Sequence, residues 1–262
     1  MASAPLVVQP LPGLPEIRRG DDLATLILAA LRRADLALQA GDVLVVAQKI
    51  VSKAEGRSVD LTTITPSSKA VELAARVQKD ARFVELVLSE SAEVVRAAPG
   101  VLVTRHRLGF VMANAGIDRS NVPAEDATRP EDTVLLLPVD CDGSAARLRA
   151  RITALAPLGA AEPAVVISDS FGRPWRQGVV NIALGVAGLP ALRDLRGGLD
   201  REGRSLQMTQ VAVADALAAV AGLAMGEAAE GMPVVHVRGL DISGPLSDGQ
   251  SLIRPPDEDL FR

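Results

Sequence analysis

The sequence predicts an α/β fold built around a mixed sheet, and three observations support this prediction. Hydrophobic residues make up 48% of the 262 residues and charged residues 23%, a balance that excludes wholesale disorder. Apolar runs typical of buried strands alternate with segments of helical periodicity, but without the regular rhythm of a parallel strand–helix–strand protein. The length slightly exceeds that of most single cores, so we expect one domain over residues 1–262, with room for two interlocked α/β subdomains.

The first half of the chain alternates short strands and helices. A β-type run at 6–8 precedes the turn-rich LPGLP at 11–15, and Asp21 and Asp22 open a helix that we expect to reach about Gln39. The continuous apolar run at 43–46 predicts a buried strand. The segments that follow are predicted as helices at 67–77 and 82–88 and as strands at 101–103 and 110–112.

The second half continues this alternation. We expect strands at 133–138, 164–167 and 234–237, and helices at 144–155 and 211–225. The strand at 164–167 is expected to end in the polar SDS, and the last helix to stop at the glycines of MGEAAEGM, residues 225–232. PPDED, near the C-terminus, is typical of a linker.

Composition and missing motifs exclude several classes of function. The net charge of −4 provides no basic field for nucleic acid. The most apolar stretch, 211–225, is interrupted by Asp215 and too short to span a bilayer, and the N-terminus lacks a secretory signal, so we expect a cytoplasmic protein. The motifs GxxxxGK[ST], GxGxxG and GxSxG do not occur, which argues against a Walker-type phosphate loop and the simplest Rossmann and serine-hydrolase sites.

The supply of metal-binding side chains favours hard cations. The chain has one cysteine, Cys141, and two histidines, His106 and His236, which argues against a thiolate cluster or a histidine-rich zinc site. A catalytic metal would therefore need oxygen ligands, which Mg²⁺, Mn²⁺ and Ca²⁺ prefer.

Oxygen ligands and basic side chains gather in VISDSFGRPWRQG, residues 166–178, where two of the five aromatic residues of the chain also lie. A predicted strand delivers Asp169 and Ser170, which suit Mg²⁺ or Mn²⁺. Arg173 and Arg176 follow, and both can make forked contacts with phosphate or carboxylate. The plainer alternative is that Asp169 caps a turn and the arginines are solvated.

A second polar segment, ANAGIDRSN at residues 113–121, follows the predicted strand at 110–112. Asn114, Asp118 and Asn121 offer oxygen-bearing side chains to a cation or a nucleotide. Asn and Asp are also common turn formers, so a purely structural role remains an alternative.

Two further segments can contribute charge. In MGEAAEGM, Glu227 can complete a carboxylate cage with Asp118 and Asp169, although a helix stop with solvated acids would have the same sequence. Lys49 and Lys53, four residues apart after the strand at 43–46, can reach an anionic ligand or be ordinary surface lysines. Together the four segments predict metal-assisted phosphoryl transfer, without identifying the substrate.

The same segments, in this order, resemble the coenzyme F420-0:L-glutamate ligase family, the γ-glutamyl ligases of the deazaflavin coenzyme F420. The resemblance extends over nearly the whole chain. Its matching stretches are GLPEIRRGDDL (13–23), GDVLVVAQKIVSKAEGR (41–57), ANAGIDRSNV (113–122), DCDGSAARLR (140–149), ISDSFGRPWRQGVVNIALGVAG (167–188), DREGRSL (200–206) and MGEAAEGMPVVHVRGL (225–240).

This resemblance implies a GTP-dependent ligase that adds L-glutamate to F420-0 and then a second glutamate through its γ-carboxylate. It implies that GTP phosphorylates the substrate carboxylate and that the glutamate amine attacks the acyl phosphate, because a free carboxylate is a poor electrophile. Two divalent ions, Mg²⁺ or Mn²⁺, are implied at each site, where they would neutralise phosphate charge. A requirement for K⁺ is left open.

The resemblance also implies which residues form the site. Its metal positions fall on Asp118, Asp169, Ser170 and Glu227. The nucleotide contacts that it implies are Pro12, Gly13, Leu14, Pro15, Gln48, Lys49, Lys53, Asn121, Met225, Gly226, Glu227, Ala228, Ala229, Glu230, Gly231 and Met232. As a separate hypothesis, we expect Arg173 and Arg176 to join Asp118 and Asp169 in catalysis by holding phosphate or the acceptor carboxylate.

The family fold is a two-part α/β arrangement that forms an intertwined homodimer, so a homodimer is expected. Some relatives continue into a nitroreductase-like domain after a tail similar to EDLFR, so the chain is either free-standing or part of a longer protein. Two other functions stay open, namely the same chemistry on another carboxylate acceptor, and a catalytically silent module that binds a nucleotide or a deazaflavin.

Overall fold

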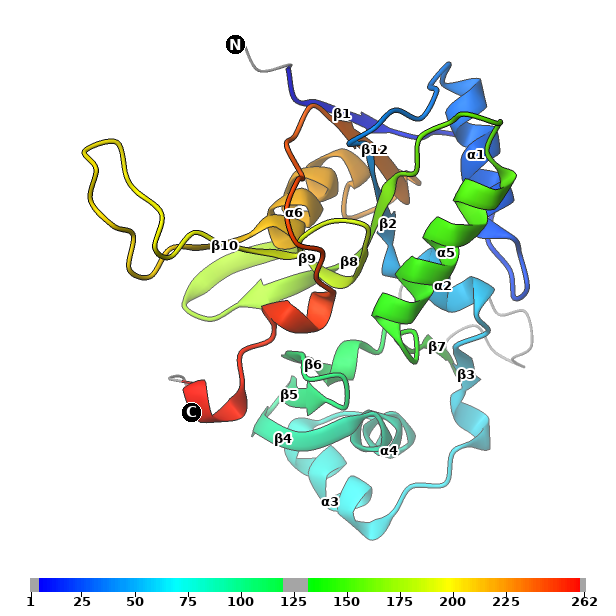
Figure 1. The fold of residues 1–262 in the computed structure, drawn as a ribbon. Coiled ribbons are helices and arrows are strands. Elements are labelled where there is room, and N and C mark those ends of the chain that lie inside the picture. The colour runs from blue at the N-terminus through cyan, green and yellow to red at the C-terminus, as the bar shows by residue number, and fades with distance from the viewer. Residues whose placement is uncertain (1–4, 120–131, 260–262) are drawn as a thin grey trace.

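A five-stranded mixed sheet forms the centre of the protein in a computed structural model that describes residues 5–119 and 132–259 (Figure 1). In spatial order its strands are β1 (Val7–Pro10), β12 (Val234–Arg238), β2 (Val43–Ala47), β8 (Ala164–Arg173) and β9 (Arg176–Ala187). Strands β2 and β8 are parallel, and the other neighbouring pairs of this sheet are antiparallel. The predicted α/β class with a mixed sheet is therefore confirmed.

Helices cover both faces of this sheet (Figure 1). Helices α1 (Leu23–Arg33) and α5 (Cys141–Leu155) contribute to one core, together with Leu44 and Val46 of β2. Helix α6 (Val213–Met225) contributes to a second core on the opposite face, and successive residues of β2 alternate between the two. Because both faces are covered, the whole apolar run at 43–46 is buried, as predicted.

A smaller α/β lobe adjoins the large sheet, at the bottom of Figure 1. Its elements are the helices α3 (Ser68–Val77) and α4 (Ala81–Ser89) and the antiparallel strands β4 (Ser91–Ala98), β5 (Val101–His106) and β6 (Val111–Ala113). Residues such as Phe83 and Leu102 give this lobe a core of its own. Strands β3 (Ser58–Asp60) and β7 (Thr133–Leu135) pair antiparallel between the lobe and the large sheet (Figure 1).

Two predicted elements are shorter than expected, and one segment expected to be a linker contains a turn. Helix α1 begins after Asp22, whose side chain accepts from the N–H of Thr25, but it ends well before Gln39. Asp35 takes a left-handed φ of +54°, which closes the helix. Strand β7 ends at Leu135, and PPDED holds the short 3₁₀ turn Pro256–Glu258.

Strand β8 is longer than predicted, and several elements, among them β9, α2 and β4, were not predicted. Strand β8 does not end at residue 167 but continues to Arg173, because it pairs with β9 through its polar residues. Helix α2 (Gln48–Ala54) follows β2 without a loop. Strand β4 is largely exposed and carries no clear alternation of apolar residues.

An extended arm projects from the body of the protein, at the left of Figure 1. Strands β10 (Leu192–Asp194) and β11 (Gln210–Ala212) form its two-stranded base. Two large apolar side chains along the arm face solvent, with Leu199 70% exposed and Met208 88% exposed. In the part of the chain that the structure describes, no helix has the length and apolar character needed to cross a membrane.

Candidate active site

Asp169 and Ser170 lie within β8, beyond the end of its parallel neighbour β2. The parallel pairing ends with Ala47 opposite Ser168, so the next residues of β8 project past the carboxyl end of β2. The prediction that Asp169 and Ser170 end a strand is therefore wrong, although they do lie beside the carboxyl end of β2. Such ends of parallel strands are where α/β sheets commonly place binding groups.

A hollow of about 430 Å³ opens at this place, and we name it the α2 hollow after the helix on one side of it. The N-terminal turn, β8 and the loop after α6 form its other sides. The predicted site residues that line it are Leu14, Pro15, Gln48, Lys49, Lys53, Asp169, Ser170, Met225, Gly226, Glu227, Ala228, Ala229, Glu230, Gly231 and Met232. Segments from the start, the middle and the end of the chain thus meet in one hollow.

A second hollow, of about 480 Å³, lies on the side of the small lobe, and we name it the β6 hollow. It is lined by β6, by the turn that leads to Asp118 and by β8 from Asp169 to Arg173. Backbone hydrogen bonds of 3.0 and 2.9 Å between Asp118 and Leu135 fix the position of that turn. Asp169 and Ser170 line both hollows, so they form the wall that the two hollows share.

The charge around Asp169 is strongly negative. The pKa of Asp169 is raised to about 7, first by burial and then by the nearby carboxylates of Asp118 and Glu227. A hydrogen bond of 2.9 Å from the N–H of Ser170 and the charge of the Lys49 ammonium group offset this only in part. Lys49 Nζ itself lies 2.7 Å from Asp118 Oδ2. Asp169 therefore lacks positive charge that a bound cation would supply.

The oxygen donors suit a hard divalent cation. Carboxylates and a hydroxyl are the ligands that Mg²⁺ and Mn²⁺ prefer, and Asp169 would bind more readily as the deprotonated carboxylate. Within residues 5–119 and 132–259, however, no three His, Cys, Asp or Glu side chains converge on one point. Asp118 and Asp169 line one hollow while Asp169 and Glu227 line the other, an arrangement that suits two ions better than one.

The polar residues of α2 are held by the protein rather than free in solvent. The Lys53 side chain is only 10% exposed, and its ammonium lies 2.5 Å from Glu16 Oε1. Gln48 is buried, and its Nε2 donates to Ser52 Oγ at 2.6 Å. The interpretation of Lys53 as an ordinary surface lysine is therefore wrong.

The loop after α6 combines a helix stop with a wall of the α2 hollow. Gly226 ends α6 with a φ of +75°, and a Cβ added there would lie 2.2 Å from the Glu230 carboxyl carbon. Glu230 folds back to accept from the N–H of Ala228 at 2.8 Å, and this bond lowers its pKa. The glycine-assisted helix stop is confirmed, and the same turn positions Glu227 beside the hollow.

Comparison with known proteins identifies the family of this chain. The sequence model that describes the F420-0:gamma-glutamyl ligase family matches residues 13–239. The chain belongs to this ligase family. The coenzyme F420:L-glutamate ligase of Methanothermobacter thermautotrophicus is 46% identical over 252 residues, which cover 95% of this chain and 96% of that protein.

Two other members of the ligase family are similarly related. The coenzyme F420:L-glutamate ligase of Methanopyrus kandleri is 43% identical, over 98% of both chains. The protein of the same name from Archaeoglobus fulgidus is 45% identical, over 97% of this chain and 96% of its own. The resemblance stated from the sequence is thus confirmed.

Four of the predicted site residues are not placed in either hollow. Pro12 and Gly13 line neither, and the Gly13 carbonyl accepts from Arg33 Nη2 at 2.8 Å. Arg176 is exposed at the start of β9, outside both hollows. Asn121 lies outside the residues that the structure describes.

The sequence analysis missed several residues that line the α2 hollow, among them the polar residues Glu16, Ser168 and Asn181. Asn181 lies opposite Ser170 in the register of β8 and β9, and a polar residue in the apolar run VVNIALGV was the available signal. Glu16 pairs with Lys53, and its place in the matching stretch GLPEIRRGDDL was the signal there.

Proposed function

We propose that this protein is a GTP-dependent ligase that adds L-glutamate to coenzyme F420-0 and then a further glutamate through the γ-carboxylate. Relatives that match this chain over nearly their whole length are named coenzyme F420:L-glutamate ligase. Their name supports F420-0 and L-glutamate as the substrates. The observation that carries the proposal is the position of Asp169, a carboxylate short of positive charge in the wall shared by two hollows.

The proposed reaction has two steps. A carboxylate oxygen of the acceptor attacks the γ-phosphorus of GTP, a P–O bond forms, and the bond to the β-phosphate oxygen breaks, giving an acyl phosphate and GDP. The glutamate amine then attacks the acyl carbon, so that a C–N bond forms and phosphate leaves with the electron pair of the C–O bond. The amine proton passes to solvent or to phosphate.

The residues of the α2 hollow suit the nucleotide. The hollow, of about 430 Å³, has the size of a small-molecule site, and Lys49 and Lys53 bring positive charge to it. Asp118, Asp169, Glu227 and the Ser170 hydroxyl would hold Mg²⁺ or Mn²⁺. When bound, these ions would neutralise phosphate charge and polarise the phosphoryl group. The chain itself orients the carboxylates through the backbone bonds of Asp118 and Ser170.

The decisive experiment is a reconstitution. The purified protein is incubated with F420-0, GTP, L-glutamate and Mn²⁺, with and without K⁺, and the products are read by mass spectrometry. We expect glutamylated F420 and one GDP per glutamate added, and no product from the Asp169→Asn variant. A folded, metal-loaded protein that makes no product would contradict the proposal, and turnover of a different carboxylic acid alone would assign the same chemistry to another acceptor.

We propose in addition that the ligase is a homodimer whose arms contribute to the contact. Leu199 and Met208 expose apolar surface on an arm that projects from the body, which is costly unless another chain covers it (Figure 1). Light scattering is expected to give twice the monomer mass. The double variant Leu199→Glu, Met208→Glu should lower it toward that of a monomer, whereas Leu158→Glu, at an exposed loop position elsewhere, should not.

A further inference from the structure

We propose that the β6 hollow binds the acceptor, a molecule that joins a flat apolar ring system to an anionic tail, and that Arg173 holds that tail. This inference rests on the proposed function, and it places the acceptor F420-0 in a different hollow from GTP. Nucleotide and acceptor would then approach Asp169 and Ser170 from opposite sides.

The shared wall gives the first argument. In phosphoryl transfer the attacking and leaving oxygens lie roughly in line, on opposite sides of the phosphorus. If GTP occupies the α2 hollow, its γ-phosphate lies near Asp169 and Ser170, and the attacking carboxylate must come from beyond them. The β6 hollow contains the same two residues and is otherwise lined by different residues, largely from the small lobe, so it offers a separate approach to them.

The lining of the β6 hollow gives the second argument. Its walls are largely apolar and include Val111 and Met112 of β6 and Phe171 of β8. Phe171 is only 8% exposed and packs edge-on against Phe110, with ring centroids 6.3 Å apart, so this wall is rigid. Ligand sites of about 300–1,000 Å³ are common, and a volume of about 480 Å³ can hold a tricyclic ring.

Charge gives the third argument. Asp118 and Asp169 repel an anion, yet the acceptor must bring a carboxylate to this place. Arg173 is the basic residue among those that line the β6 hollow, and it does not line the α2 hollow. Its Nη2 donates to the Gln177 carbonyl at 2.9 Å, which orients the guanidinium group, while its buried Nε has no partner among the described residues. Arg173 is therefore positioned to bind the anionic tail of the acceptor rather than the phosphates of GTP.

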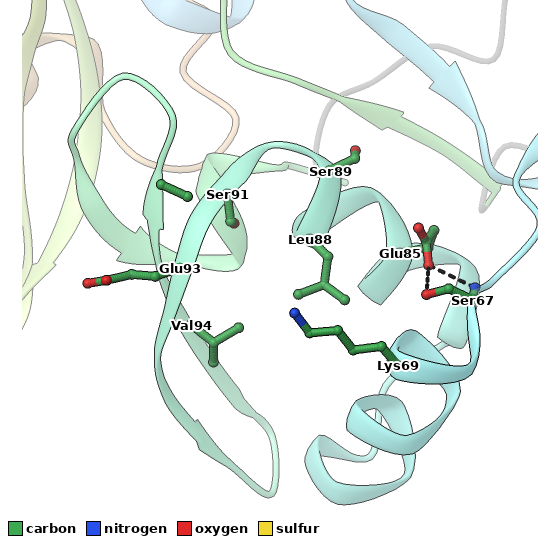
Figure 2. A pocket seen from close by; sticks show the side chains of 9 residues that line it. Ser67, Lys69, Glu85, Leu88, Ser89, Ser91, Glu93 and Val94 are labelled. Atoms are coloured by element: carbon green, nitrogen blue, oxygen red, sulfur yellow. Dashed lines mark hydrogen bonds between the residues drawn. The ribbon is translucent and has the colours of Figure 1, made fainter.

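A third hollow provides a control on the same small lobe. About 220 Å³ in volume, it lies between β4 and the helices α3 and α4, where Lys69 extends toward Leu88 and Val94 (Figure 2). Glu85 is occupied there by two hydrogen bonds from Ser67, of 2.8 and 2.5 Å. None of the predicted site residues lines this hollow. It can therefore be filled without affecting either substrate.

The experiment fills one hollow at a time. Ala113 is exposed on β6 and lines the β6 hollow, whereas Ala92 is exposed on β4 and lines the control hollow. We expect Ala113→Trp to weaken F420-0 binding at least tenfold, measured by deazaflavin fluorescence and as the KM for F420-0, while the KM for GTP is unchanged. Ala92→Trp should change neither.

The arginine is tested in the same way. Arg173→Met should weaken F420-0 binding by about 10- to 100-fold, the loss expected for a hydrogen bond to a charged group, and Arg173→Lys should restore part of it. Unchanged F420-0 affinity in Ala113→Trp and Arg173→Met, or a change in the KM for GTP instead, would overturn the inference. Because binding is read without turnover, a wild type that binds F420-0 but forms no product would contradict the proposed function and leave this site supported.

Discussion

Two carboxylates at opposite ends of the same pair of parallel strands, Asp42 buried and Asp169 half-buried, have opposite surroundings. Asp42 precedes β2 at its amino end, and its side chain is 0% exposed. Arg238 donates to it through Nε and Nη2, both at 2.7 Å, and His236 Nε2 lies 2.9 Å away. Burial alone would raise the pKa of Asp42, but the hydrogen bonds from Arg238, the N–H of Gln39 and His236 lower it.

Asp169 lies beyond the carboxyl end of β2, and it has too little positive charge nearby to offset its desolvation. Its nearest charged neighbours include two further carboxylates, and its pKa is raised to about 7, above all by burial. Asp42 has the surroundings of a structural carboxylate, whereas those of Asp169 are typical of a binding or catalytic group. The fold brings compensating cations to Asp42, whereas Asp169 has the Lys49 ammonium group against two further carboxylates and so remains short of positive charge.

Substitution of Asp169 should affect catalysis more strongly than any other change. Asp169→Asn should lower kcat by roughly 10³-fold or more, because it removes a ligand that would stabilise charge in the transition state. Asp118→Asn and Glu227→Gln should act similarly. Steady-state rates of glutamylation measure this, with circular dichroism as the check on folding. Near-normal rates in all three variants would place the chemistry elsewhere.

The next largest effect is on stability. Asp42→Asn should lower the free energy of unfolding by about 3–5 kcal/mol, because Arg238 and His236 would lose their buried charge partner. Urea denaturation measures the change. We expect a normal KM for GTP in the fraction that stays folded. A loss of less than about 1 kcal/mol would show that the interactions of Asp42 with Arg238 and His236 contribute little to stability.

Divalent ions should stabilise the protein only when Asp169 is intact, whereas Asp42 should not matter for this effect. Mn²⁺ at about 100 times its dissociation constant should stabilise the wild type by roughly 2.7 kcal/mol, and calorimetry should show a higher Tm. Asp42→Asn should keep most of this gain, whereas Asp169→Asn should lose it. An equal gain in all three proteins would mean that the ion binds away from Asp169.

The smallest effect is a pH dependence of opposite sign at the two carboxylates, measured without divalent ions. The raised pKa of Asp169 means that the unfolded chain releases its proton first as the pH rises. The stability of the wild type relative to Asp169→Asn should therefore fall between about pH 4 and pH 7 and then level off. The lowered pKa of Asp42 means that its contribution is lost as the pH falls below about 4. Parallel curves for wild type and variants would contradict both assignments.

The sequence predicted those features that local patterns determine. Asp22 at the start of α1, the buried run at 43–46 and the glycine-assisted end of α6 follow from periodicity and capping alone. The type of each site residue, an acid, a hydroxyl or a base, was also visible in the polar segments.

Features that depend on distant pairing could not be predicted. β8 extends through its polar residues only because β9 pairs with it, and that pairing gives Asp169 and Ser170 their place in a wall between two hollows. The Glu16–Lys53 pair likewise joins segments whose contact no local pattern indicates. The side chains that offset the negative charge of Asp42 are His236 and Arg238 of β12, near the other end of the chain.

Anomalous diffraction at the manganese absorption edge, from crystals grown with Mn²⁺ and GDP, would show whether Asp169 binds the metal. We expect manganese peaks within coordination distance of Asp169, with Asp118 on one side and Glu227 on the other, and GDP in the α2 hollow. Manganese bound elsewhere in a catalytically active crystal form, with Asp169 contacting only water, would contradict this expectation.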